Sequence, residues 1–180
     1  MTLVAVLAGG RGRRMGTPKP LAQLDGAPLI ARPLAAAAAA GLDAVVVAKP
    51  DTPLPALAVP VWHEPAEPVH PLLGVVTALA RAAQPVVAVA CDMPFVPPEL
   101  LARLASGPEA AVTVGGRLEP FPARYEPAAL PVLRAALADG ASVRATLAAL
   151  APATLELEDG RPLASVNTPE ELAAAARSRP

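Results

Sequence analysis

TLVAVLAGGRGRRMGTPKPL, residues 2–21, contains the pattern that decides the fold class of this chain. Residues 2–7 form a short, mostly apolar and β-branched run that ends in glycines, which predicts a buried strand. Clustered glycines and basic side chains then follow, although glycine weakens regular structure and like charges repel. Both features suit a loop that binds an anion, because glycines let N–H groups approach phosphate oxygens and basic side chains neutralise them. The alternative is an ordinary tight turn with solvated arginines.

Apolar runs of strand length alternate with helical patterns along the rest of the chain. Strands are expected at residues 44–48, 59–62, 85–91, 111–114, 121–125 and 153–157. Helices are expected at residues 28–40, 72–83, 98–105, 127–138, 142–149 and 169–177. Pro33 is expected to kink the first helix or to mark its true first turn. This alternation predicts one domain over residues 1–180, a Rossmann-like three-layer α/β/α fold with a mostly parallel central sheet.

Composition excludes several classes of function. With 15 basic and 16 acidic residues the net charge is −1, and only 2% of residues are aromatic, which argues against a nucleic-acid partner. One cysteine and two histidines allow neither an internal disulfide nor a zinc cluster and fit a reducing compartment. The longest apolar run, residues 34–42, is about half of a membrane span, and the N-terminal charges follow the apolar run. We therefore expect a cytoplasmic protein with no membrane or nucleic-acid partner.

Two common phosphate-binding loops do not match residues 7–21. A Walker A loop has glycine directly before its lysine, whereas Pro18 precedes Lys19. The dinucleotide-binding fingerprint needs a glycine three residues after Gly12, where Met15 stands.

LAGGRGRRMGTPKPL instead resembles the LAGG-x-S-x-RMG-x-D-K-x-L signature of MobA-like nucleotidyltransferases, in particular the molybdenum cofactor guanylyltransferases. The spacing from Leu7 to Lys19 matches without a gap, while Gly12 and Pro18 depart from the signature. The resemblance implies a nucleotide-diphospho-sugar transferase-like fold. It also implies Mg²⁺-dependent transfer of GMP from GTP to molybdopterin, with release of pyrophosphate. In that reaction Arg14 and Lys19 would hold the triphosphate and the leaving pyrophosphate.

The nucleotide is expected to contact the end of the first strand and the start of its loop, at Leu7, Ala8, Gly9 and Gly10. Main-chain groups there are not yet committed to a helix and are expected to read the whole edge of guanine. The resemblance also favours guanine, since cytidylyltransferase relatives usually carry LAAG instead of LAGG.

Two further motifs supply candidate site residues. CDMPFVPPELL, residues 91–101, is similar to the family's CD-x-P-[FY]-[IV] segment, which implies that Asp92 binds the Mg²⁺ and the nucleotide. Without the resemblance Asp92 reads as a helix cap or turn residue, and Cys91 as packed in the sheet. SVNTPEEL, residues 165–172, has a capping pattern that accounts for Thr168 and Glu171. The family's N-x-N-T-P-E-[DE]-L segment implies that Asn167 lies near the phosphates and the acceptor.

HEPAEPVHPLLG, residues 63–74, covers a region where the family has an acidic residue and then G-P-L-x-G. Glu64 is our choice for the acidic nucleotide-binding position. His70 replaces the first glycine, and both His63 and His70 are interpreted as structural or solvated. Lys49, where the family has a small or amide residue, is assigned no role.

Other readings remain open at the sequence level. Arg117 and Arg144 fit either an anionic acceptor or a plain surface charge. The chain could be a cytidylyltransferase or another nucleotidyltransferase of this fold, or a nucleotide-binding module without turnover, although Lys19 and Asp92 together argue against the last. The expected partners are GTP, molybdopterin and proteins of molybdenum insertion or molybdoenzyme maturation.

Overall fold

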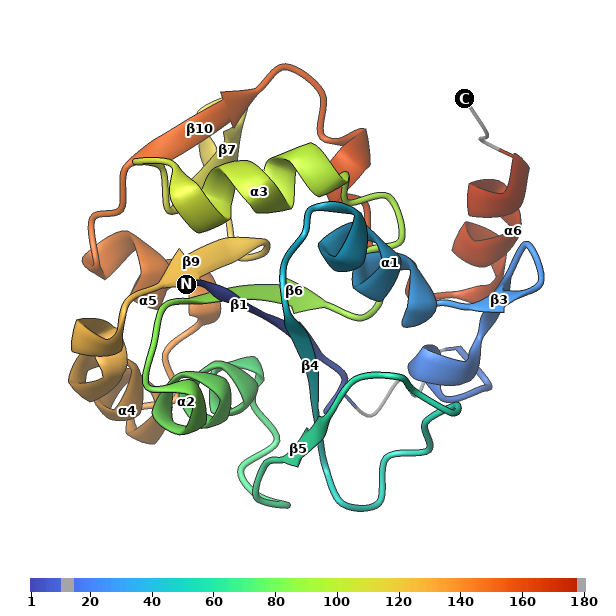
Figure 1. The fold of residues 1–180 in the computed structure, drawn as a ribbon, viewed down its shortest axis with the longest axis horizontal. Coiled ribbons are helices and arrows are strands. Elements are labelled where there is room, and N and C mark those ends of the chain that lie inside the picture. The colour runs from blue at the N-terminus through green and yellow to red at the C-terminus, as the bar shows by residue number, and fades with distance from the viewer. Residues whose placement is uncertain (11–14, 178–180) are drawn as a thin grey trace.

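The computed structural model describes residues 1–10 and 15–177 and contains a central sheet covered by helices on both faces (Figure 1). Its strands lie in the order β5 (Val61–His63), β4 (Ala44–Ala48), β1 (Leu3–Leu7), β6 (Val86–Ala90) and β9 (Ala123–Tyr125). Neighbouring strands pair in parallel, except that β9 is antiparallel to β6. The predicted α/β class with a mostly parallel central sheet is confirmed.

The helices form the outer two layers (Figure 1). One face carries α1 (Ala31–Ala39) and α3 (Pro98–Ser106), and the other carries α2 (Pro71–Ala82), α4 (Leu130–Ala138) and α5 (Val143–Ala149). The core has two halves, one between the sheet and each helix layer. Successive side chains of β1 point to opposite faces of the sheet and therefore enter the two halves in turn.

In β1, Val4 and Val6 pack with the cluster of α1 and α3, whereas Leu3 and Ala5 pack with that of α2. All four side chains are buried, so β1 is apolar on both faces.

Two predicted elements begin later in the structure than the sequence predicts, and in both cases a proline lies at the predicted start. Pro28 belongs to β3 (Ala27–Pro28), which pairs with β2 (Gln23–Leu24), so α1 begins only at Ala31 and Pro33 lies in its first turn. The strand expected at 59–62 begins at Val61, because Pro60 has no N–H for the ladder and only its carbonyl pairs, with Val46.

The second half of the chain adds a smaller sheet in the order β10 (Thr154–Leu157), β7 (Ala111–Val114) and β8 (Arg117–Glu119). Short 3₁₀ turns lie at η1 (Lys19–Leu21), η2 (Pro127–Ala129) and η3 (Arg161–Leu163).

The last helix, α6 (Pro169–Arg177), lies beside the β2–β3 hairpin (Figure 1). A separate apolar cluster joins the two: Met15, Ala22, Leu24, Leu29, Val166 and Ala175. This cluster therefore packs the chain around residues 15–29 against Val166 and α6.

Strand order determines where a ligand site can form. From β1 the chain moves outward to β4 and β5, then returns to place β6 on the other side of β1. In open parallel sheets, ligands bind beyond the carboxyl ends of the strands where the order reverses. That position is occupied here by the segments after β1 and β6. In the described part of the chain, no helix has both the length and the apolarity to span a membrane.

Candidate active site

Three segments far apart in the sequence meet at the carboxyl end of the central sheet. Lys19 begins η1, Asp92 follows β6 by two residues, and Asn167 precedes α6. The Lys19 ammonium donates to Asp92 Oδ2 and to Asn167 Oδ1, each at 2.5 Å. The Lys19 and Asp92 side chains are 18% and 12% exposed, so the pair is shielded yet still reachable by a ligand.

Main-chain hydrogen bonds hold this cluster in place. The Val166 N–H donates to the carbonyl of Asp92 at 2.8 Å, which ties the segment before α6 to the end of β6. Thr168 caps α6 by accepting from the Glu171 N–H at 3.2 Å, as the capping pattern predicts. The Glu171 carboxylate in turn accepts from the Asn167 N–H at 2.6 Å. The cap of α6 therefore also fixes Asn167, the residue that the capping pattern alone left unexplained.

A second charged pair, Lys49 and Glu64, lies where β4 and β5 end. Both side chains are buried, and Lys49 Nζ lies 3.5 Å from Glu64 Oε1. The same ammonium donates to the carbonyls of Pro65 at 2.8 Å and Ala66 at 2.7 Å. Burial raises the pKa of the Glu64 carboxyl, and the charge of Lys49 opposes that rise. Glu64 also abuts Gly9, because a Cβ on Gly9 would lie 2.0 Å from Glu64 Oε1.

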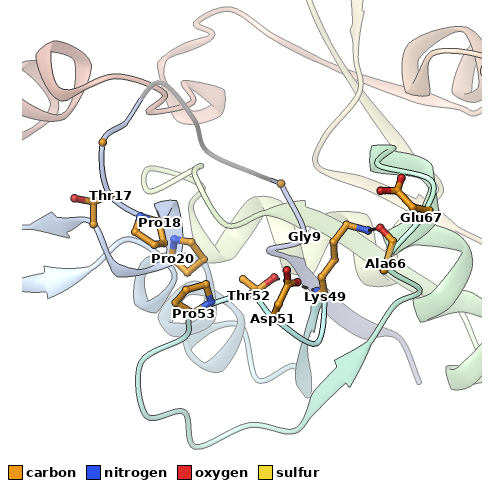
Figure 2. Close-up of a pocket in the computed structure, with 12 residues that line it drawn as sticks. Gly9, Thr17, Pro18, Pro20, Lys49, Asp51, Thr52, Pro53, Ala66 and Glu67 are labelled. Atoms are coloured by element: carbon orange, nitrogen blue, oxygen red, sulfur yellow. Dashed lines mark hydrogen bonds between the residues drawn. The ribbon is translucent and has the colours of Figure 1, made fainter.

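Two cavities meet at Gly9 and Gly10. The first, called here the Lys49 cavity, has a volume of about 420 Å³ and lies between the loop after β1, the loop after β4 and residues 66–67. Figure 2 shows Lys49 extending toward Ala66, with Asp51 beside it and Thr17 on the far side of the cavity. The second, the Asp92 cavity, has a volume of about 340 Å³ and is also lined by Lys19, Glu64 and Asp92.

Sequence reasoning missed Lys49, although it lines the first cavity and holds its wall. One local signal was present: a lysine directly after the buried strand AVVVA, which puts a cation at the carboxyl edge of a parallel sheet. The Asp25-Gly26 pair, with positive φ at both residues, likewise marked the missed β2–β3 hairpin.

The main chain of residues 7–10 is less open than expected. The Leu7 carbonyl accepts from the Cys91 N–H at 3.0 Å, and the Ala8 N–H donates to the carbonyl of Val47 at 2.8 Å. These two groups are not committed to a helix, but they are not available to read the edge of guanine either, because the sheet ladder extends one residue past β1. Gly9 and Gly10 line both cavities.

Several other predicted residues lie elsewhere. Arg14 falls outside the described residues. Arg144 Nε donates to the carbonyl of Leu118 at 2.7 Å, and neither Arg144 nor the exposed Arg117 lines either cavity. His63 is exposed at the end of β5 and lines neither cavity. Burial, followed by the charge of Asp92, raises the pKa of the Cys91 thiol to about 12, which leaves it protonated and unreactive.

The donor set fits a metal that enters with a nucleotide. Among residues 1–10 and 15–177, no three His, Cys, Asp or Glu side chains converge into a preformed cage. Mg²⁺ is commonly bound by one or two carboxylates together with substrate phosphates, and Asp92 offers such a carboxylate in the cavity that Gly9 and Gly10 also line.

The chain is similar in sequence and in fold to known nucleotidyltransferases. The family model described as MobA-like NTP transferase domain matches residues 4–155. The chain is 37% identical to the molybdenum cofactor guanylyltransferase of Rhodobacter capsulatus, over 94% of this chain and 92% of that protein. It is 34% identical to the protein of the same name from Cereibacter sphaeroides, over 94% and 93%. Its fold is similar to that of molybdopterin-guanine dinucleotide biosynthesis protein A from Archaeoglobus fulgidus, with a TM-score of 0.76, 26% identity and 97% of each chain covered.

Proposed function

The chain belongs to the MobA-like NTP transferase family, and from this premise we propose that it transfers GMP from GTP to molybdopterin with release of pyrophosphate. We further propose that residues 1–180 act as one nucleotidyltransferase domain, that Mg²⁺ is the metal and that the reaction takes place in the cytoplasm. Proteins of molybdenum insertion or molybdoenzyme maturation would receive the product.

The convergence of Lys19, Asp92 and Asn167, of which the first two line the Asp92 cavity, is the observation that carries the proposal. One ammonium contacts both a carboxylate and an amide, 73 and 148 residues away in the sequence. The Lys49 cavity has room for a nucleoside, and a triphosphate lying along Gly9 and Gly10 would reach Lys19 and Asp92. The Asp92 cavity leaves space on the far side for the second substrate.

The chemistry requires charge stabilisation and alignment more than proton transfer. A phosphate oxygen of molybdopterin forms a bond to the α-phosphorus of GTP, and the bond from that phosphorus to the bridging oxygen of pyrophosphate breaks. Both substrates are anions that repel each other. Lys19, with Arg14 from the same loop, would offset this repulsion and hold the leaving pyrophosphate.

Asp92 and Asn167 complete the proposed site. Bound Mg²⁺, held by Asp92, would neutralise charge on the phosphates. Asn167, fixed through Glu171, would orient the attacking phosphate by a neutral amide contact. The main chain of Gly9 and Gly10, which lines both cavities, would bind the nucleotide, and Glu64, which lies against Gly9 from the side of the Asp92 cavity, would position that main chain. Leu7 and Ala8 would support it from the sheet.

The test compares nucleotides with molybdopterin as the second substrate. We expect pyrophosphate release and a labelled dinucleotide product from α-labelled GTP, and at least about a hundredfold lower rate with CTP, because buried polar groups matched to guanine stay unpaired against cytosine. Equal rates, or faster reaction with CTP, would overturn the guanylyl assignment and leave nucleotidyl transfer standing. Binding of GTP with no product from any nucleotide would indicate a binding module instead.

A further inference from the structure

His70 is positioned in the Asp92 cavity by its role at the start of α2. It is the N-cap of that helix, and its Nδ1 accepts from the Leu72 N–H at 3.2 Å. The ring is half-buried and lines the cavity together with Lys19, Asp92 and Phe121. The sequence predicts a structural or solvated role for this histidine, and the cap is indeed a structural role. The cap uses only one of the two ring nitrogens.

The cap also determines which nitrogen carries the proton. Because Nδ1 accepts a hydrogen bond, the neutral ring has its hydrogen on Nε2, which is then a donor. No partner for Nε2 occurs in the described part of the chain. The main-chain donors of this first turn are already used, since Pro71 has no N–H, Leu72 is bonded to the ring and the Leu73 N–H donates to the His70 carbonyl at 3.0 Å. The imidazole N–H is therefore the donor that the start of α2 can offer to a ligand.

We propose that the Nε2–H of His70 binds the phosphate monoester of the substrate that receives the GMP group. This inference rests on the proposed function, which places the triphosphate along Gly9 and Gly10. His70 lines the Asp92 cavity and does not line the Lys49 cavity, so it lies on the side away from the nucleoside. A neutral N–H there would bind an anionic oxygen and would add to the hold of Lys19 and Asn167 on the two phosphates.

Substitution by asparagine separates this contact from the cap. Asparagine is among the best N-cap residues, so His70→Asn keeps an acceptor for the Leu72 N–H while it removes the Nε2–H. We expect the KM for molybdopterin to rise about tenfold, the loss of one hydrogen bond to a charged group, with the KM for GTP and the thermal midpoint close to the parent values. His70→Ala should show the same rise in KM and should also lower the midpoint, because the cap is lost.

His63→Asn is the matched control, since His63 is exposed and lines neither cavity, and we expect it to behave like the parent in every measurement. Equilibrium binding of molybdopterin, followed by pterin fluorescence without nucleotide, tests the contact independently of turnover. A His70→Asn protein that binds molybdopterin as tightly as the parent refutes the inference. A parent protein that binds molybdopterin but forms no product from GTP refutes the proposed function. In that case the comparison of molybdopterin binding between the parent and His70→Asn still decides whether His70 contacts this substrate. A parent that does not bind molybdopterin overturns both.

Discussion

Replacing Gly9 with alanine would place one methyl group where the structure has no room for it. The new Cβ would lie 2.0 Å from Oε1 and 2.8 Å from Cδ of Glu64, so the carboxylate has to move. Its movement is restricted, because Glu64 is 5% exposed and Lys49 holds Oε1 at 3.5 Å. The substitution therefore overpacks a buried ion pair.

Overpacking a buried site typically costs about 1–3 kcal/mol, and we expect Gly9→Ala to lower the free energy of unfolding by about 2 kcal/mol. For a chain of this length that corresponds to a thermal midpoint lower by about 4–8 °C. Gly10 provides the matched control, since a Cβ there would have no atom of residues 1–10 or 15–177 within 4 Å. Gly10→Ala should stay within about 0.5 kcal/mol of the parent.

Denaturant unfolding of four variants tests the cause of the loss: Gly9→Ala, Gly10→Ala, Glu64→Ala and the Gly9→Ala/Glu64→Ala double variant. If the carboxylate is the obstacle, adding Gly9→Ala to a chain that already carries Glu64→Ala should cost less than about 0.5 kcal/mol. Equal stability of Gly9→Ala and Gly10→Ala would refute the reasoning. An unchanged cost of Gly9→Ala in the Glu64→Ala background would show that some other contact causes the loss.

Two further predictions concern the charged groups of the site. Lys49→Met should lower the free energy of unfolding by about 3 kcal/mol at pH 8, because it leaves the Glu64 carboxylate buried without its counter-charge. Burial raises the pKa of the Glu64 carboxyl above its ordinary value of 4.5, so the contribution of this group to folding stability is fully present below pH 4.5 and declines as the pH rises through the folded-state pKa. The loss of stability caused by Lys49→Met should therefore be smaller at pH 5 than at pH 8. Unfolding measured at both pH values will show the difference. Asp92→Asn should reduce Mg²⁺-dependent pyrophosphate release at least about a hundredfold, because the negative charge is lost. The thermal midpoint should stay nearly unchanged, because the volume is almost constant and the amide oxygen can still accept from the Lys19 ammonium.

Each of these has its own control. A Lys49→Met deficit that is the same at pH 5 and pH 8 would exclude the Glu64 charge as its cause, and the double variant with Glu64→Gln should lose the pH dependence. For Asp92→Asn, pyrophosphate release at the parent rate would show that Asp92 is not needed for the metal-dependent step, whereas a lowered thermal midpoint would indicate a structural role.

Local sequence was sufficient to predict the central strands, because all of their side chains face the apolar interior. Residues 3–7 and 86–90 are apolar on both faces because helices cover both sides of the sheet, and this pattern is visible without coordinates. The start of α6 was equally predictable, since Thr168 and Glu171 make their contacts within four residues. Pairing direction was not, because the short β9 run looks the same whether it pairs parallel or antiparallel to β6.

The sequence by itself determined the alternation of strands and helices, the glycine-rich loop after β1 and the resemblance that pointed to Lys19, Asp92 and Asn167. Only the tertiary structure brought those three side chains to 2.5 Å contacts, paired Lys49 with Glu64 and distinguished crowded Gly9 from open Gly10. The physical reason is the distance along the chain over which the interactions act. Helix and strand patterns arise from neighbours a few residues apart. The environment of a side chain depends on strand order and loop packing, which join residues 73 and 148 positions away.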